Sequence, residues 1–295
     1  MIQPGHFPFK CWICGANQLE TAKPANIKKS LNSGAFAITD SAYGVTGEIH
    51  RCANCGFLQC SGFQEVLPFY ERLQDPAYEV GRAERALQAR KLLDVIQKYR
   101  PNDRLLDIGA ASGILVEQAI QMDYRAEGIE PSRWLQEKAQ AYGLPVHLGT
   151  FPHPEVTGPY DVVTLIDVIE HVPNPVALLS AVRHVLAADG IAVVVTPDVG
   201  SLMARLLGWK WWHFRIAHIG YFNRKTLEMA TRHAGFRLIK MHRPGWYFTV
   251  DYLIERINTY LPRMTRIQAP SFLKGMTIPL NLGDSMLGVY TLNDE

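Results

Sequence analysis

The sequence predicts an α/β protein in which helices cover both faces of a mostly parallel sheet, after a small cysteine-rich N-terminal domain. Three observations support this fold class. Short apolar runs alternate with helical patterns over most of the chain, which is typical of repeated β–α units. Turn residues such as glycine and asparagine dominate residues 1–70 instead. Two Cys-x-x-Cys pairs lie within that same stretch.

Composition narrows the function classes. The 295 residues include 30 Lys and Arg against 28 Asp and Glu, a net charge of +2 that does not favour a nucleic-acid partner. No window approaches the roughly 20 consecutive apolar residues of a membrane span. The first residues lack the charged-then-apolar pattern of a secretory signal, so we expect a cytoplasmic protein. The sequence does not indicate an oligomeric state.

The N-terminal domain is predicted from its cysteines. Cys11 and Cys14 form one Cys-x-x-Cys pair, and Cys52 and Cys55 form another. Two such turns that meet give four thiolates in a tetrahedron, which suits Zn²⁺. Four protein ligands leave no open coordination position, so the ion would be structural. A redox dithiol is the alternative, but no thioredoxin-like β–α–β pattern surrounds the pairs.

The elements of the larger domain follow in order. A helix is expected over 77–100, with Pro101 ending it. The expected strands cover 104–109, 125–131, 145–149, 160–168, 191–197, 237–243 and 286–292. The expected intervening helices cover 114–122, 134–143, 175–190 and 226–236. A long connection, 244–285, contains a further expected helix over 248–261.

A glycine loop follows the first of these strands. In "LLDIGAASG", Asp107 precedes Gly109 and Gly113, and the next helix begins there. Glycine permits positive φ and close approach of a ligand, while the helix N-terminus offers free N–H groups. Glu130 ends the next strand, where a carboxylate can accept two ribose hydroxyls. These residues predict a nucleoside cofactor, and a nicotinamide dinucleotide remains an alternative at this point.

Motifs further along the chain indicate which cofactor is bound. "YDVVTLIDVIEHVPNP" resembles the corresponding strand and turn of class I S-adenosylmethionine-dependent methyltransferases. "LLDIGAASG", "GIEPS", "LAADGIAVVVTP" and "HIGYFNRKTLEMATRHAGF" add to this resemblance in the family's order, roughly over 78–241. The resemblance implies a Rossmann-like seven-stranded sheet with an antiparallel last strand. It divides the chain into a zinc-ribbon-like domain, 1–70, and a methyltransferase domain, 71–295, in which 243–285 is a helical insertion or substrate cover.

The resemblance also implies which residues hold S-adenosylmethionine. They are Asp107, Gly109, Ala110 and Gly113 in the loop, Glu130 at the ribose, Pro131, Thr150 and Phe151 around the adenine, and Asp167 and Val168 beside the methyl group. One position departs from the family, because Ala111 stands where glycine is common. We expect this alanine to fit by keeping φ negative.

An acid–acid–histidine cluster follows the fourth strand. "DVIEH" supplies Asp167, Glu170 and His171, and His218 lies in a later loop. In one interpretation His171 is a general base that the acids orient, with His218 nearby. In another, all four residues bind a divalent ion, and their oxygen ligands favour Mg²⁺. That set resembles the E-x-x-E-H pattern of ubiquinone-pathway and small-RNA 2′-O-methyltransferases. A purely structural cap on the following helix is the third interpretation.

The methyl acceptor is harder to predict. "LLGWKWWHFRIAHIGYF" is rich in aromatic residues and suits either a packed core or a substrate lid. Methyl transfer from S-adenosylmethionine to a small molecule is the leading hypothesis, with a sugar hydroxyl as acceptor by analogy. A quinone, another natural product or RNA held by the zinc ribbon are alternatives. A scaffold that binds the cofactor without turnover is a further one.

Overall fold

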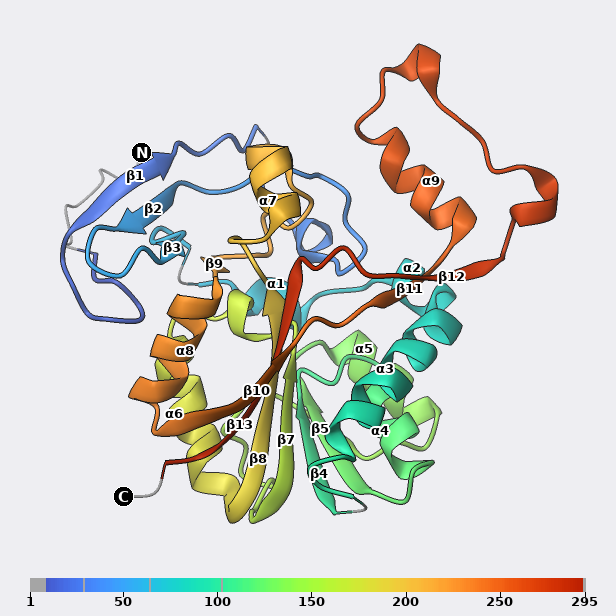
Figure 1. Cartoon of the computed structure of the whole chain (residues 1–295). Coiled ribbons are helices and arrows are strands. Elements are labelled where there is room, and N and C mark those ends of the chain that lie inside the picture. The colour runs from blue at the N-terminus through green and yellow to red at the C-terminus, as the bar shows by residue number, and fades with distance from the viewer. Residues whose placement is uncertain (1–8, 29, 64, 102, 294–295) are drawn as a thin grey trace.

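A seven-stranded sheet forms the centre of the molecule (Figure 1). The computed structural model describes residues 9–28, 30–63, 65–101 and 103–293. The strand order is β10-β13-β8-β7-β4-β5-β6. These strands are β4 (Arg104–Ile108), β5 (Arg125–Glu130), β6 (Val146–Leu148), β7 (Tyr160–Ile166), β8 (Leu186–Pro197), β10 (Phe236–His242) and β13 (Ser285–Leu292).

Strand directions confirm the Rossmann-like prediction. β6, β5, β4, β7 and β8 run parallel to one another. β13, the last strand in the chain, inserts between β8 and β10 and runs antiparallel to both. The chain passes from β4 to β5 on one side and later to β7 on the other, so the strand order reverses beside β4. A crevice at such a reversal, outside the carboxyl ends of the strands, is where ligands bind in this kind of sheet.

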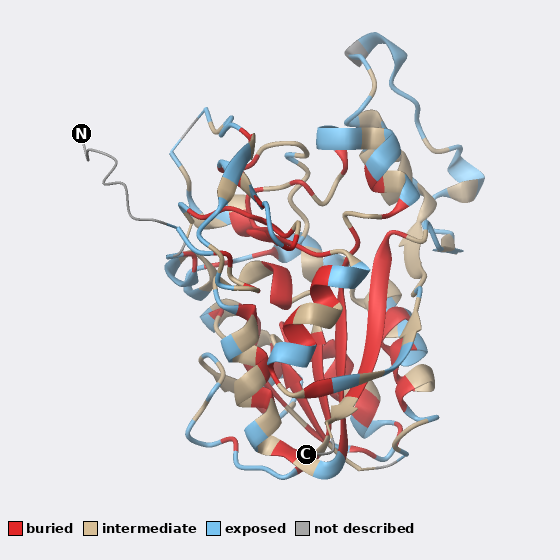
Figure 2. Ribbon diagram, turned by 60° about the vertical axis from the view of Figure 1, so that its left-hand side comes forward, coloured by how far each residue is buried: buried red, intermediate tan, exposed pale blue. Residues whose placement is uncertain are grey.

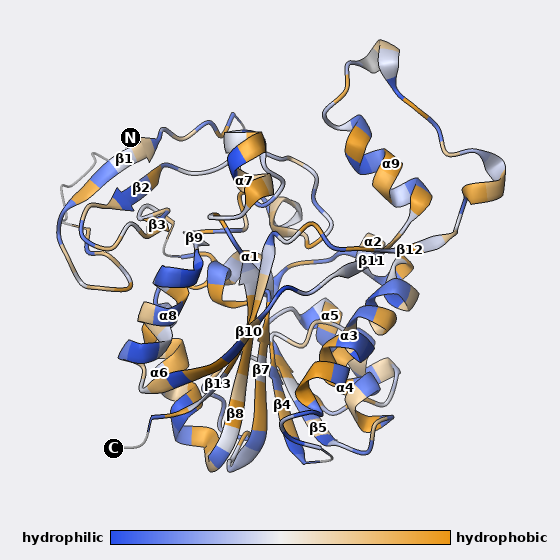
Figure 3. Cartoon of the chain, in the orientation of Figure 1, coloured by the Kyte–Doolittle hydropathy of each residue, from blue (hydrophilic) through white to orange (hydrophobic). Residues whose placement is uncertain are grey.

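Two apolar layers cover the sheet because successive side chains point to opposite faces. Leu106, Val163 and Val194 pack with one group of buried residues, which includes side chains of α6 and α8. Their sequence neighbours pack with a second group, under α3 and α4. Figure 3 shows the apolar residues concentrated along β7 and β8, where both faces are covered. The α-helices are α1 (Leu67–Glu71), α2 (Pro76–Val80), α3 (Arg82–Ile96), α4 (Ile114–Ile120), α5 (Arg133–Ala141), α6 (Pro175–Val185), α7 (Leu202–Leu207), α8 (Arg224–His233) and α9 (Val250–Asn258).

Two helix predictions need correction. The helix expected over 77–100 is divided at Gly81 into α2 and α3. The helix expected to reach Gly190 ends at Val185. Leu186 already has extended backbone, with φ −79° and ψ 140°, and pairs with Tyr160 of β7. The sequence after Val185 is rich in alanine and favours helix locally, but pairing with β7 overrides that preference.

The N-terminal segment builds a second, four-stranded sheet. Its order is β1 (Leu19–Lys23), β2 (Ile49–Cys52), β3 (Leu58–Gln59) and β9 (Gly220–Tyr221). The last of these strands comes from the larger part of the chain, so the two parts share a sheet. Helix α1 also spans the boundary expected after residue 70. The division into two domains at that point stays a prediction.

The connection between β10 and β13 forms an arm. β11 (Trp246–Thr249) and β12 (Thr277–Leu280) pair antiparallel at its base, and α9 follows β11. Figures 1 and 2 show the arm extending from the body with many exposed residues. Short 3₁₀ turns complete the described structure: η1 (Ser33–Phe36), η2 (Ile169–His171), η3 (Gly208–Lys210), η4 (Arg263–Thr265) and η5 (Ser271–Leu273). Among the helices of the described residues, none has the length and apolarity needed to cross a bilayer.

Candidate functional site

The loop between β4 and α4 depends on its glycines. Gly109 and Gly113 have φ of +77° and +75°, a left-handed conformation that L side chains rarely adopt. A Cβ on Gly109 would stand 2.6 Å from Cγ2 of Val168. The N–H groups of Gly109 and Ala110 each donate to the Ile129 carbonyl at 2.9 Å, which ties the loop to β5. The loop therefore lies between the ends of β5 and β7.

Ala111 corrects the expectation of a negative φ. Its φ is +48°, so it occupies the left-handed region despite having a Cβ. That conformation costs an L-residue about 1–2 kcal/mol. It directs the Ala111 N–H at the carboxylate of Glu130, with 2.8 Å between N and Oε2. A hydrogen bond to a buried carboxylate offsets the strain, and nothing in the local sequence indicates it.

Glu130 is the acidic centre of this region. It is only 6% exposed, and its other oxygen accepts a hydrogen bond from Ser132 N at 2.8 Å. Burial raises the pKa of Glu130 to about 7, although the two N–H donors oppose that shift. Each carboxylate oxygen keeps a second acceptor position for further donors. The residue thus holds the glycine loop and can still receive hydroxyl groups.

The neighbouring predicted residues lie around this loop. Asp107 is buried and accepts a hydrogen bond from Thr164 Oγ1 at 2.7 Å, and burial raises its pKa to about 7. Pro131 follows Glu130 and is partly buried. Thr150 is exposed and Phe151 partly buried, just after Gly149, whose N–H donates to the Glu130 carbonyl at 2.9 Å. That bond brings the 150–151 turn to the end of β5.

Asp167 and Val168 occupy the end of β7. Asp167 has a φ of +52°, and its N–H donates to the Val195 carbonyl at 2.9 Å. Burial raises the pKa of Asp167 to about 7, while Arg85 opposes the shift. Val168 covers Gly109 as described above. The structure therefore places Val168 against the glycine loop, with Asp167 next to it in the sequence.

A second group forms where β7 leads into η2. Glu170, His171 and His218 place metal-ligating atoms within 4.8 Å of one another, and Asp167 is not part of that group. Glu170 is 1% exposed, and its Oε2 accepts a hydrogen bond from Thr196 Oγ1 at 2.9 Å. Its Oε1 is buried without a partner in the described structure. Burial raises the pKa of Glu170 well above its ordinary value, and the charge of Asp167 adds to the rise.

The two histidines of this group are held differently. The Nδ1 of His171 lies 2.6 Å from Tyr70 Oη and 2.8 Å from the Ala217 carbonyl oxygen. The ring of His218 meets that of His171 edge to face, with 4.8 Å between centroids. Burial lowers the pKa of His171 to about 4 and that of His218 well below its ordinary value. Both imidazoles are therefore neutral at pH 7, and burial makes each a weaker base than an exposed histidine.

Sequence reasoning missed several residues of this group. Tyr70 and Thr196 carry no motif, and Tyr70 lies 101 positions from its partner His171. Asp284 accepts a hydrogen bond from the indole N–H of Trp211, at 3.3 Å. Trp211 is fully buried whereas Trp209 is 39% exposed, so the aromatic stretch is divided between core and surface. Only spatial proximity identifies Tyr70, Thr196 and Asp284, whereas Trp211 belongs to the aromatic stretch already visible in the sequence.

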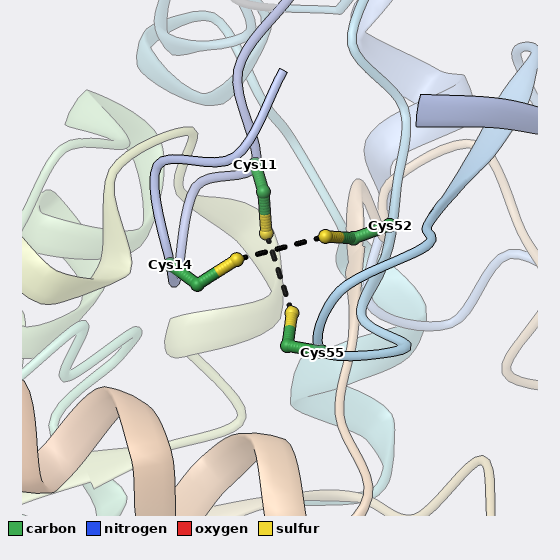
Figure 4. Close-up of side chains that lie close together, drawn as sticks. All are labelled: Cys11, Cys14, Cys52 and Cys55. Atoms are coloured by element: carbon green, nitrogen blue, oxygen red, sulfur yellow. Dashed lines mark hydrogen bonds between the residues drawn. The ribbon is translucent and has the colours of Figure 1, made fainter. Parts of the chain in front are cut away.

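The four cysteines converge as predicted (Figure 4). The Sγ atoms of Cys11 and Cys55 are 3.5 Å apart, and those of Cys14 and Cys52 are 3.6 Å apart. All four Sγ atoms lie within 4.8 Å of one another. A tetrahedral zinc site with Zn–S bonds of about 2.3 Å places its sulfurs roughly 3.8 Å apart. Cys60 is buried elsewhere and is not part of the cluster.

The parallel sheet with its antiparallel β13, the glycine loop after β4 and the acid that ends β5 define the fold of class I S-adenosylmethionine-dependent methyltransferases. A family model described as a methyltransferase domain matches residues 81–241. The chain belongs to that family.

Named relatives cover a smaller part of the chain. A ubiquinone biosynthesis O-methyltransferase of Psychrobacter cryohalolentis is 29% identical over 106 residues, and one of a Caulobacter species is 30% identical over 101 residues. Each alignment covers 32% of this chain and 40% of the relative's length. One similar solved structure is a complex from Haloferax volcanii between the Trm112 methyltransferase activator and a protein named there as a methyltransferase. The matching chain of that complex has a TM-score of 0.53 and is 14% identical. That match covers 78% of this chain and 99% of the solved one, and it shows the fold.

The loop region fits the cofactor that the fold implies. A side chain at Gly109 would overlap Val168, so only glycine lets the loop take this path beside the end of β7. Glu130 presents unused acceptor positions in a buried setting, which suits the two hydroxyls of a ribose. The donor set is thus right for S-adenosylmethionine.

Proposed function

We propose that this protein transfers a methyl group from S-adenosylmethionine to a hydroxyl of a small-molecule acceptor. The observation that carries the proposal is the adjacency of two groups at the carboxyl edge of one sheet. The glycine loop with Glu130 can hold the donor, and the buried cluster of Glu170, His171 and His218 begins three residues after Asp167. Donor and base would therefore lie at the same edge of the sheet.

The proposed donor site uses the residues named from the sequence. Asp107, Gly109, Ala110 and Gly113 would face the methionine part and ribose, and Glu130 would accept the ribose hydroxyls. The remaining residues are proposed around the adenine and the methyl group: Pro131, Thr150, Phe151, Asp167 and Val168. When bound, S-adenosylmethionine supplies a methyl carbon on a positively charged sulfur, which leaves with the electrons of the carbon–sulfur bond.

His171 is the proposed general base. Its lowered pKa keeps the imidazole unprotonated at neutral pH but also makes it a weaker base. Its proposed role is to take the proton from an acceptor hydroxyl as the oxygen forms its new bond. Burial and the nearby charge of Asp167 raise the pKa of Glu170, which favours its protonated form, and a protonated Glu170 could donate a hydrogen bond to the acceptor. The edge-to-face contact between the rings of His218 and His171 supports a positioning role for His218.

A divalent ion is a second candidate in the same place. The unpartnered Oε1 of Glu170 favours it, because a buried carboxylate oxygen without a donor suits a cation. His171 and His218 would complete the ligands, and Asp167 would need to turn toward them. Mg²⁺ is the proposed ion for the oxygen-containing set. Turnover that survives EDTA would exclude this version of the site.

Zn²⁺ is the proposed ion for the cysteine cluster. The sulfur separations are close to those of a tetrahedral site, and the N–H groups of Gly15 and Gly56 close the two turns onto the Cys11 and Cys52 carbonyls at 2.9 Å each. The role is structural, because four thiolates leave no open position.

The acceptor is proposed to be a sugar hydroxyl, with a quinol or another natural product as the alternative. The names of the curated relatives favour a quinol, but those alignments cover only about a third of this chain. The deciding experiment is an assay with methyl-labelled S-adenosylmethionine against separate pools of sugar nucleotides, quinols and small RNAs. The proposal expects label in one small-molecule pool and its loss in His171→Ala. Label in RNA alone would overturn the small-molecule assignment, and no label in any pool would favour a non-catalytic binder.

A further inference from the structure

The buried contact between Tyr70 and His171 joins the cysteine-bearing segment to the proposed base. Tyr70 lies on α1, at the end of that segment. Its Oη lies 2.6 Å from His171 Nδ1 and donates to the Ala217 carbonyl at 3.1 Å. The ring of His171 stands at 76° to that of Tyr70, with 5.5 Å between centroids. Two separate parts of the chain therefore hold one edge of the imidazole.

This geometry selects one tautomer of His171. The Ala217 carbonyl oxygen can only accept a hydrogen bond, and it lies 2.8 Å from Nδ1. A hydrogen on Nδ1 makes this contact favourable, whereas a lone pair there would face the lone pairs of the carbonyl oxygen. Tyr70 donates its own hydrogen to the same carbonyl, so its oxygen is free to accept from Nδ1–H. In a neutral imidazole with Nδ1–H, Nε2 bears the lone pair.

The Ala217 carbonyl is itself held by the N-terminal segment. Cys60 N donates to the Ile219 carbonyl at 2.7 Å, and Gly44 N donates to the Phe214 carbonyl at 2.6 Å. The guanidinium of Arg215 donates to the carbonyls of Ala37 and Ile38. The 214–219 stretch thus has main-chain anchors on both sides of Ala217. The acceptor of the Nδ1–H bond is fixed by the same segment that supplies Tyr70.

We propose that Tyr70 is a positioning residue that fixes His171 as the Nδ1–H tautomer and leaves Nε2 to accept the proton from the methyl acceptor. The cysteine-bearing segment then contributes to the reaction through Tyr70 and through its anchors on 214–219, without contacting the reacting atoms. The inference rests on the proposed function for its catalytic consequence. The tautomer itself is a property of the protein alone.

The test uses Tyr70→Phe, which removes only the hydroxyl. The phenyl ring keeps its packing beside Leu73 and Ala111, so donor binding should not change. Tyr124→Phe is the matched control. The hydroxyl of Tyr124 also donates to a main-chain carbonyl, that of Arg100, at 2.6 Å, and it does not contact His171. Each variant is measured as the full chain by two readouts. One is the ¹⁵N and ¹H resonances of the His171 imidazole, and the other is kcat and KM with the acceptor pool that takes label in the methyl-transfer assay proposed above.

The wild-type protein should show Nδ1 protonated and Nε2 unprotonated, with a strongly downfield Nδ1–H proton. Tyr70→Phe should move that proton upfield and lower kcat by about three- to tenfold, the range for one lost hydrogen bond, with KM for S-adenosylmethionine unchanged. Tyr124→Phe should do neither.

Two results would overturn the inference. One is an Nε2–H tautomer in the wild type. The other is an Nδ1–H resonance that responds no more to Tyr70→Phe than to Tyr124→Phe. If the wild type turns over no acceptor while the resonances behave as expected, the proposed function fails and the tautomer assignment stands.

Discussion

Gly109→Ala should destabilise the fold by an amount that can be divided into two parts. At φ +77° an alanine sits in the left-handed region, which costs about 1–2 kcal/mol. Its Cβ would also stand 2.6 Å from Val168 Cγ2, well inside an ordinary carbon–carbon contact of about 3.5–4.0 Å. Forcing Val168 aside is overpacking, which costs about 1–3 kcal/mol. We expect the free energy of unfolding to fall by about 2–5 kcal/mol.

Gly143→Ala separates the two contributions. Gly143 has a φ of +71°, but a Cβ there would meet nothing within 4 Å. It should therefore lose only the conformational part, about 1–2 kcal/mol. In the double variant Gly109→Ala with Val168→Ala, the clash between the two side chains is removed. After the cost of Val168→Ala alone is subtracted, the double variant should therefore regain the stability lost to the clash, about 1–3 kcal/mol. Urea unfolding of the four variants and the wild type measures these differences.

The two glycine variants should also differ in their affinity for S-adenosylhomocysteine. Gly109→Ala should weaken it, because Val168 is displaced beside the loop, whereas Gly143→Ala should bind as the wild type does. The reasoning fails if Gly109→Ala and Gly143→Ala lose equal stability, or if the double variant recovers nothing.

Three further predictions concern a metal and two titrating groups. Cys52→Ser should remove about one zinc per chain by metal analysis, and folded protein purified without zinc would refute the site. Affinity for S-adenosylhomocysteine should rise as the pH passes through about 7, because Glu130 must ionise to accept two hydroxyls, and Glu130→Gln should flatten that rise. Hydrogen bonds to Glu127 and Glu155 raise the pKa of His147 above 6.5, despite the opposing effect of burial. The stabilisation that protonated His147 gives to the folded state is therefore complete below about pH 6.5, and it is lost as the pH rises through the folded-state pKa of His147. His147→Gln should destabilise the protein more at pH 5.5 than at pH 9, and an equal loss at both would contradict this.

The sheet could be predicted because its strands are continuous apolar runs. Segments such as 160–166 and 191–197 are buried on both faces, so their composition alone indicates a strand. The extension of β8 back to Leu186 could not be predicted, because "LAAD" favours helix and only pairing with Tyr160 makes it extended. The two-residue strands β3 and β9 are too short to leave any periodic pattern.

Parts of the candidate site could be predicted where the spacing of residues in a motif indicates that their side chains lie close together in the fold. The two Cys-x-x-Cys pairs meet each other as expected. Separately, the glycine loop around Gly109 packs against Val168 at the end of β7. The positive φ of Ala111 was not predictable, because it depends on a hydrogen bond to Glu130 from a different strand. Tyr70 was missed for the same reason, since its contact with His171 forms only when the N-terminal segment folds onto the sheet.

Calorimetric titration with S-adenosylhomocysteine tests the central claim most directly. The wild type should bind at one site, and Glu130→Ala should bind at least about tenfold more weakly, since hydrogen bonds to a charged group contribute about 1.5–3 kcal/mol. Glu127→Ala is the control on the same strand, because its carboxylate bonds to Tyr160 and His147 instead, and it should bind as the wild type does. Circular dichroism confirms that each variant is folded. Absence of binding by the folded wild type, or equal affinity in wild type and Glu130→Ala, would contradict the assignment of this loop to the methyl donor.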